Sequence, residues 1–246
     1  MKSDDRIKFI IHWIQDYCKS IKKQPVSLIV GVSGGVDSAV TSALCAKTGL
    51  RTIAVSMPIR QQHNQHNLSF SHLKWLETNF DNVITREINL DDTFNTFYKT
   101  IKEFNSELAF ANSRSRLRMM TLYQIAQSSN GLVVGTGNKV EDFGVGFYTK
   151  YGDGGVDISP IADCTKTQIW EMGTTLSIKE HIINAKPTDG LWDDSRNDEM
   201  QLGLTYKQIE EAMVNPSSEY YNKYLEIREP NLHKMKPIPI CKFKVS

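Results

Sequence analysis

Six residues, Ser33 to Ser38, combine two glycines, two hydroxyl side chains and one carboxylate in the order SGGVDS. They follow an apolar run at 26–32, which is typical of a buried strand, and they precede a helix predicted over 36–48. Such a turn can hold phosphate groups, because glycines let the backbone approach an anion and the first N–H groups of the helix face it. The alternative is an ordinary tight turn between strand and helix, with no ligand.

Asp37 indicates which kind of phosphate site this turn could form. A carboxylate beside phosphates is repelled unless a cation lies between them, so Asp37 is a candidate ligand for Mg²⁺. A Walker A loop would place a lysine before its final hydroxyl residue, where this turn has Asp37. The turn instead resembles the phosphate loop of the ATP pyrophosphatases, enzymes that cleave ATP to AMP and pyrophosphate while they activate a substrate oxygen.

Strands and helices alternate along the N-terminal half of the chain, and this order predicts where the turn lies. The strands are expected over 26–32, 52–57, 82–88 and 131–135, and the helices over 4–22, 36–48, 67–79, 91–102 and 105–129. This alternation predicts a single α/β domain over 1–246, with a doubly wound parallel sheet flanked by helices, Rossmann-like and of the ATP pyrophosphatase type. Ligands bind at the carboxyl ends of such strands, so the loops at 33–38, 57–61 and 135–138 should converge on one crevice.

The chain becomes irregular and rich in glycine after residue 143. Helices are predicted near 166–178, 205–213 and 217–228. A tail that begins at about residue 230 has too many prolines for a regular element. Long irregular loops in a compact domain are usually functional or mobile, so the glycine-rich part is a candidate for the site.

Composition limits the classes of partner. The chain has 246 residues, 40% of them hydrophobic, and a formal net charge of +1, which gives no broad electrostatic field for nucleic acid or a membrane surface. Its four cysteines are scattered, as expected for reduced thiols in a cytoplasmic protein. We expect neither a signal peptide nor a transmembrane span.

Further segments sharpen the resemblance. They are NSRSRLRM at 112–119, GTGNKVE at 135–141, KYGDGGVDISPIAD at 150–163, TKTQ at 165–168, KPTDGLW at 186–192, DE at 198–199 and HK at 233–234. Together with SGGVDS they resemble the ammonia-dependent NAD synthetase family over nearly the whole chain. The resemblance implies a ligase that converts deamido-NAD, ATP and ammonia into NAD, AMP and diphosphate through an adenylated deamido-NAD intermediate, with Mg²⁺ as cofactor.

The resemblance also implies the site residues. Those for ATP are Gly31, Ser33, Gly34, Gly35, Val36, Asp37, Ser38, Arg118, Thr136, Lys166 and Thr188. Those for deamido-NAD are Asn112, Arg116, Lys150, Asp153, Asp157, His233 and Lys234. The expected metal ligands are Asp37 and Glu141, and the expected catalytic residues are Asp153, Lys166 and Asp37. Asp153 is the candidate for holding ammonia or ammonium and helping to remove its proton.

Several assignments stay open. The stretch between Glu141 and Lys150 is one residue longer than in the family pattern, so the second metal ligand could be Asp142 instead. Arg114 is expected to be solvated or to contact a second subunit. The histidines of the polar segment are expected in a solvated loop rather than a metal cluster, and they are His63, His66 and His72.

The resemblance further implies a homodimer with the deamido-NAD site at its interface, to which the helices near 4–22 and 105–129 could contribute. The chain is too short to hold a glutamine-hydrolysing domain beside the synthetase, so free ammonia is the expected nitrogen source. Two rival functions are another ATP pyrophosphatase, of the amidotransferase or tRNA-modifying kind, and a non-catalytic regulator that binds adenine nucleotides.

Overall fold

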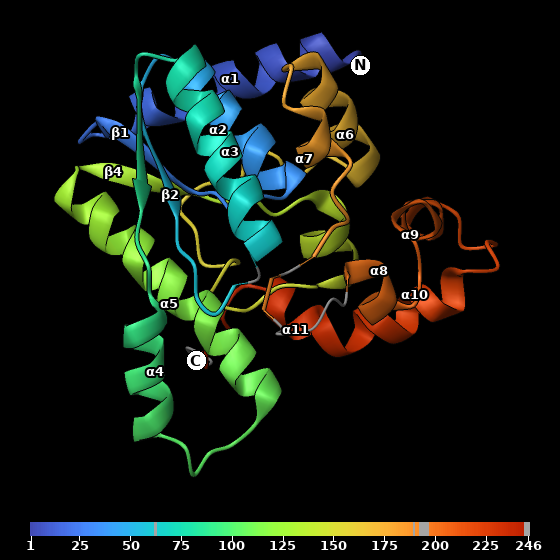
Figure 1. Cartoon of the computed structure of the whole chain (residues 1–246). Helices are drawn as coiled ribbons and strands as arrows, with labels where there is room; N and C mark the ends of the chain where they lie inside the picture. The colour runs from blue at the N-terminus through green and yellow to red at the C-terminus, as the bar shows by residue number, and fades with distance from the viewer. Residues whose placement is uncertain (62, 189, 192–196, 244–246) are drawn as a thin grey trace.

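The computed structural model describes residues 1–61, 63–188, 190–191 and 197–243. In this part of the chain, four parallel strands form one sheet in the order β3-β2-β1-β4 (Figure 1). The strands are β1 (Ser27–Gly31), β2 (Arg51–Ser56), β3 (Val83–Glu87) and β4 (Gly131–Val134). In the central strand β1, Ile29 pairs in register with Ile53 on one side and Val133 on the other. Neighbours on both sides and helices on both faces explain the unbroken apolar run in this strand.

The strand order changes direction at β1. From β1 the chain continues to β2 and then β3 on one side, and it later returns to β4 on the other side. The point between the carboxyl ends of β1 and β4 is therefore the topological switch point, where open α/β sheets bind ligands. The SGGVDS turn leaves β1 at this point and the GTGN segment leaves β4.

Helices cover both faces of the sheet. One apolar core lies between the sheet and a layer in which α2 contacts α1, α3 and α6, and a second core lies under α4 and α5. The first layer consists of α1 (Ser3–Ser20), α2 (Val36–Lys47), α3 (His63–Asn79) and α6 (Lys166–Thr175). The second consists of α4 (Asp91–Thr100) and α5 (Glu107–Ser128). The sheet is thus doubly wound, as predicted.

The C-terminal part forms a third core beside the sheet. Here α9 (Tyr206–Val214) and α10 (Tyr221–Arg228) pack on the π-helix η1 (Lys139–Val145). The short α8 (Asp198–Leu202) adds Leu202 to the same apolar cluster, in which Ile209 is fully buried. We call residues Asp198–Arg228 the C-terminal lobe. The short α7 (Glu180–Ile183) follows α6.

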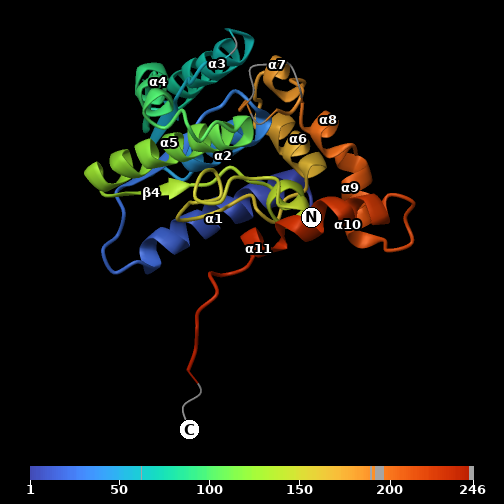
Figure 2. The ribbon, with the colours of Figure 1, turned by 90° about the horizontal axis from the view of Figure 1, so that it is seen from below.

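The tail differs from its expected form. The chain stays helical beyond Pro230, through η2 (Glu229–Asn231) and α11 (Leu232–Met235), because a proline at the first positions of a helix lacks only a donor that would be unpaired there. After Met235 the described tail leads away from the body (Figure 2). Among the described helices, none is both long and apolar enough to cross a membrane.

Candidate active site

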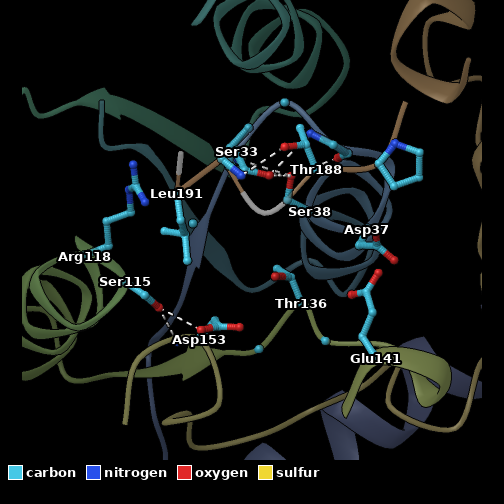
Figure 3. A pocket seen from close by; sticks show the side chains of 18 of the residues that line it. Ser33, Asp37, Ser38, Ser115, Arg118, Thr136, Glu141, Asp153, Thr188 and Leu191 are labelled. Carbon is cyan, nitrogen blue, oxygen red and sulfur yellow. Dashed lines mark hydrogen bonds between the residues drawn. The ribbon is translucent and has the colours of Figure 1, made fainter. Parts of the chain in front are cut away.

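A cavity of about 610 Å³ opens at the topological switch point. Its walls come from the SGGVDS turn, the GTGN segment, η1, the start of α6, one side of α5, and residues 185–188 and 190–191. Figure 3 shows side chains from these elements around the cavity, with Asp37 and Glu141 toward one another and Ser115 with Asp153 on another side. The loops predicted to converge therefore do so.

The SGGVDS turn lines the cavity, and its two serine hydroxyls bind its own backbone: Ser38 Oγ accepts the Ser33 N–H at 3.2 Å and Ser33 Oγ accepts the Gly35 N–H at 3.3 Å. Gly34 has φ 94°, a left-handed conformation that glycine adopts without steric cost, and Gly35 is the N-cap of α2. Ser38 Oγ donates to the Gly35 carbonyl at 2.9 Å and lies 3.1 Å from Ser33 Oγ. The turn and the N-terminus of α2 form a cradle suited to phosphate oxygens.

A buried ion group lies beside this cradle. The Lys166 ammonium is 2.6 Å from Asp37 Oδ2 and 2.9 Å from Glu141 Oε1, and its side chain is 2% exposed. Lys166 is the first residue of α6, where the helix dipole opposes a positive charge, so the two carboxylates stabilise an otherwise unfavourable placement. Thr165 and Gln168 form a capping box that fixes this end of the helix.

The charges in this group set the direction of each pKa. Burial acts to lower the pKa of Lys166, but the Asp37 and Glu141 carboxylates together raise it above its ordinary value. Burial acts to raise the pKa of Glu141, but Lys166 and the Tyr206 hydroxyl hold it below its ordinary value. Burial raises the pKa of Asp37, against the opposing effect of Lys166. We conclude that Lys166 is a cation paired with Glu141.

Asn138 links the GTGN segment to these carboxylates. Its side-chain amide donates to Asp37 Oδ1 at 2.9 Å, while its side-chain oxygen accepts the backbone N–H groups of Val140 and Glu141. The residue is fully buried. Asn138 therefore caps η1 and orients Asp37 at the same time.

Asp153 is held on another wall of the cavity. Its Oδ1 accepts the Ser115 hydroxyl at 2.7 Å and the Thr149 backbone N–H at 3.0 Å, and its own N–H binds Ser115 Oγ at 2.9 Å. Burial raises the pKa of Asp153, and the bonds from Ser115 and Thr149 only partly oppose this shift. A positioned carboxylate with a raised pKa suits a group that accepts protons.

The arginines of α5 lie on different sides of the helix, as their alternate positions require. Arg118 lines the cavity and donates through Nε to the Met57 carbonyl at 3.0 Å. Arg114 is buried, contrary to the expectation of a solvated or intersubunit residue. It stacks over Phe94 and donates to the Leu191 carbonyl at 2.9 Å, so it ties α5 to the segment beside the cavity.

Most residues expected at deamido-NAD lie outside this cavity. Thr149 Oγ1 donates to Asn112 Oδ1 at 2.5 Å, and Arg116 Nε donates to the Lys150 carbonyl at 3.3 Å. The Asp157 carboxylate accepts the Val133 N–H at 2.8 Å and the Tyr123 hydroxyl at 3.1 Å, which supports the edge of β4. Lys234 donates to the Tyr148 carbonyl at 2.9 Å, and His233 is exposed. Six residues expected at deamido-NAD do not line the cavity: Asn112, Arg116, Lys150, Asp157, His233 and Lys234.

The residues expected at ATP mostly do line the cavity. They are Gly31, Ser33, Gly34, Gly35, Asp37, Ser38, Arg118, Thr136, Lys166 and Thr188. The side chain of Val36 packs instead in the core under α2. The KPTDGLW segment is described only in part, because Asp189 and Trp192 lie outside the described residues.

His72 is not in a solvated loop. It is fully buried in α3, where its Nε2 lies 2.9 Å from Ser42 Oγ and its ring stacks on Trp75. Burial lowers the pKa of His72 to about 4, so the ring is neutral near pH 7. His66 is partly exposed and lies 3.7 Å from Glu87.

Asp37 and Glu141 fit a Mg²⁺ ion. Both carboxylates reach one cation, Lys166, and both adjoin the phosphate cradle, which matches the preference of Mg²⁺ for one or two carboxylates together with phosphate oxygens and water. Asp142 also lines the cavity, where its carboxylate lies against Gly137, and burial together with the charges of Glu141, Asp153 and Asp37 raises its pKa. Glu141 and Asp142 both lie in the π-helix η1, a rare form of helix that is frequent at functional sites.

Sequence reasoning missed three residues that complete the site. Ser115 lies in the NSRSRLRM motif and Asn138 in the GTGNKVE motif, so the motifs themselves could have indicated both residues. The Tyr206 hydroxyl lies 2.6 Å from Glu141 Oε1. Tyr206 lies outside the recognised motifs, so the sequence gives no indication of this contact. Its role depends on packing of the C-terminal lobe against η1.

The fold and the cavity define a class: an α/β protein with a glycine-containing turn suited to phosphate and a buried carboxylate–lysine group at the switch point of its sheet. Comparisons with known proteins then identify the family. The sequence profile described as NAD synthase matches residues 6–238. The chain therefore belongs to the NAD synthase family.

Individual relatives cover nearly the whole chain. It is 33% identical to the NH(3)-dependent NAD(+) synthetase of Mesoplasma florum over 239 residues, which are 96% of this chain and 93% of the relative. Among solved structures, it resembles the NMN synthetase from Francisella tularensis with a TM-score of 0.90 and 29% identity, over 99% of this chain and 100% of the other. It shares its fold with the NH3-dependent NAD synthetase from Campylobacter jejuni, with a TM-score of 0.79 and 22% identity over 98% and 100% of the chains.

Proposed function

We propose that the chain is an ammonia-dependent NAD synthetase, which uses ATP to amidate deamido-NAD. The observation that carries the proposal is the Asp37–Lys166–Glu141 group beside the SGGVDS cradle, in the same cavity as Asp153. A phosphate cradle alone would suit any nucleotide-binding protein. The added cation, carboxylates and proton acceptor suit an enzyme that activates one substrate and adds an amine to it.

The cradle and Lys166 support the first step. The turn at Ser33–Ser38 would bind the phosphates of ATP through backbone N–H groups and the two hydroxyls. The nicotinate carboxylate then attacks the α-phosphorus, pyrophosphate leaves, and an acyl adenylate forms. Lys166 would stabilise the negative charge that develops on the phosphate oxygens. Activation is needed because a carboxylate is a poor acyl donor.

Asp153 supports the second step. Ammonia attacks the acyl carbon of the adenylate and AMP leaves, with the loss of one proton from nitrogen. Asp153 Oδ1 is fixed by Ser115 and Thr149, so the carboxylate is positioned to hold the ammonium ion and accept its proton. The raised pKa of Asp153 makes it a better acceptor than an ordinary carboxylate.

Asp37 and Glu141 are the residues that would hold Mg²⁺. When bound, the ion would neutralise the charge of the pyrophosphate leaving group. The other proposed ATP contacts come from Arg118 on α5 and Thr136 after β4. Thr188 adds a hydroxyl from the segment tied down by Arg114.

We further propose a homodimer in the cytoplasm. Residues proposed for deamido-NAD lie outside the cavity of the single chain, on α5, the 148–157 loop and α11, so a second subunit could complete their site. Arg116 and Met120 lie one turn apart on an exposed face of α5. The four free cysteines agree with a reducing compartment.

A second candidate is an NMN synthetase, in which the acceptor is nicotinate mononucleotide. One observation favouring it is the TM-score of 0.90 with the Francisella protein. Another is the position of the six residues Asn112, Arg116, Lys150, Asp157, His233 and Lys234 outside the cavity, because a mononucleotide carries no second nucleotide for them to bind. Both acceptors present the same nicotinate carboxylate, so the chemistry of the cavity is unchanged.

One assay separates these functions. Purified protein is incubated with ATP, Mg²⁺, ammonium and either deamido-NAD or nicotinate mononucleotide, and NAD, NMN and AMP are measured by chromatography. We expect NAD and AMP in equal amounts with deamido-NAD. A larger kcat/KM with the mononucleotide would establish the second candidate. ATP cleavage without either product would indicate another ATP pyrophosphatase, and binding without turnover a regulator.

A further inference from the structure

Tyr206 lies directly behind the ion group of the cavity. It is the first residue of α9 in the C-terminal lobe and is 1% exposed. Its hydroxyl is 2.6 Å from Glu141 Oε1 and 3.0 Å from Asp198 Oδ2. A residue outside the sheet and its loops therefore contacts a carboxylate that we assign to metal binding.

The hydroxyl acts as a hydrogen-bond donor. A phenol is ordinarily protonated near pH 7, and both oxygens beside it belong to carboxylates, which accept hydrogen bonds. A phenol has one proton to donate, and the shorter contact is to Glu141. Donation to an ionised carboxylate is among the stronger hydrogen bonds in proteins.

The ring of Tyr206 contacts the other half of the pair. The Lys166 ammonium lies 4.7 Å from the ring centroid, within the range of a cation–π interaction. Lys166 and the hydroxyl also share one acceptor, Glu141 Oε1. Two donors on two different helices therefore fix the rotation of this carboxylate.

The surroundings of Tyr206 hold it in place. Thr205 caps α9 in a capping box with Gln208, and the Tyr206 N–H donates to Glu199 Oε1 at 3.0 Å. Trp170, one turn after Lys166 on α6, packs edge-on against the ring with centroids 6.0 Å apart. Backbone and ring are thus both constrained, which is what a positioning residue requires.

We propose that Tyr206 is a positioning residue for the nucleotide and metal site: its hydroxyl holds the Glu141 carboxylate toward Asp37, and its ring supports the Lys166 ammonium. The proposal rests on the proposed function, because it takes Asp37 and Glu141 as metal ligands. It makes the C-terminal lobe part of the site although only its Asp198 lines the cavity among the described residues.

Tyr206→Phe tests the proposal, because it removes the hydroxyl and keeps the ring over Lys166. Binding of Mn²⁺ with a non-hydrolysable ATP analogue is measured by isothermal titration, well below the melting temperature of each variant. We expect the dissociation constant to rise roughly ten- to hundredfold, as for the loss of a hydrogen bond to a charged group. The control is Tyr220→Phe, which removes the hydroxyl of a partly buried tyrosine in the same lobe and should leave binding unchanged.

A double-mutant cycle separates positioning from a general structural effect. If Tyr206 acts through Glu141, Tyr206→Phe should change the dissociation constant less than twofold when introduced into Glu141→Gln. Equal binding by Tyr206→Phe and wild type would overturn the proposal. So would the same factor of weakening in both backgrounds.

The binding measurement contains neither deamido-NAD nor nicotinate mononucleotide, so its result does not depend on which of them is the substrate. Wild-type protein that binds the Mn²⁺–analogue complex but forms neither NAD nor NMN would count against the proposed function and leave the role of Tyr206 to be decided by the cycle. Wild-type protein that forms product, with Tyr206→Phe binding normally, would remove the role of Tyr206 and leave the function intact.

Discussion

Lys166 carries a charge that is almost completely withdrawn from solvent, and two carboxylates compensate it. A buried ion pair adds little net stability, but removing one partner leaves uncompensated buried charge. The site therefore depends on all three charges being present together. The same arrangement makes Lys166 the residue whose loss should be felt in both folding and function.

Lys166→Met should lower the free energy of unfolding by about 3 kcal/mol, because Asp37 and Glu141 then repel each other inside the protein. Urea denaturation at pH 7 measures this change. Lys139→Gln is the matched control, because its 2.8 Å pair with Asp163 is exposed and should contribute less than about 1 kcal/mol. Equal stability of the two variants would show that the buried group does not hold these charges.

Asp153 should set the acid limit of amidation. As a proton acceptor it must be ionised, and its pKa is raised by burial, so kcat/KM for ammonia should fall as the pH decreases through a pKa above the ordinary value of 3.8. Ser115→Ala removes a hydrogen bond that favours the ionised form, which should move this limb to higher pH. Steady-state rates between about pH 5 and 9, expressed per concentration of unprotonated ammonia, test the shift. An unchanged profile in Ser115→Ala would exclude Asp153 as the titrating group.

Among the elements, the strands and most helices could be predicted because each carries a clear periodic pattern. The apolar positions Ile7, Ile10 and Ile14 recur at helical spacing, and all three are buried in α1 as this pattern implies. What periodicity does not reveal is which element covers a given face. His72 stands among polar residues, and only the packing of α3 on α2 shows that it faces Ser42 and the core.

His72 should make the α2–α3 contact sensitive to acid. Its pKa is lowered from 6.5 to about 4 in the folded chain, so the unfolded chain binds a proton first as the pH falls. The contribution to stability is complete above pH 6.5 and decreases toward pH 4, by about 3 kcal/mol. His72→Gln should lose less stability over this range than wild type, measured by urea unfolding at several pH values. Parallel pH curves for the two proteins would contradict the lowered pKa.

In the whole molecule, the C-terminal lobe packs on η1, and η1 also lines the cavity of the candidate active site at the edge of the sheet. Arg228, at the end of the lobe, donates to the carbonyls of Phe143 and Gly144 in η1. Tyr206 makes the corresponding contact to Glu141. The lobe therefore holds the π-helix through two residues, Arg228 and Tyr206. We expect substrate affinity to depend on how the lobe packs on η1.

If the proposed homodimer forms through α5, a charge at the exposed Met120 should weaken it. Met120 on α5 is 63% exposed, and burying a glutamate there in an interface would be unfavourable. Met120→Glu should raise the dissociation constant of the dimer at least about tenfold, as measured by sedimentation velocity over a range of concentrations. Met200→Glu, at a 70% exposed position in the lobe, is the control and should leave the association unchanged. A wild-type monomer at all concentrations would refute the dimer.

Local patterns and ordered motifs are enough to predict the order of strands and helices, the turn between β1 and α2, and the family. The family is confirmed by the match over residues 6–238, whereas the individual site assignments stay predictions. Which charged groups meet depends on the packing of distant segments: Lys166 and Asp37 are 129 residues apart in the chain, and Tyr206 and Glu141 are 65 apart. Such contacts follow from how the sheet, η1 and the C-terminal lobe pack, and no local pattern encodes that packing.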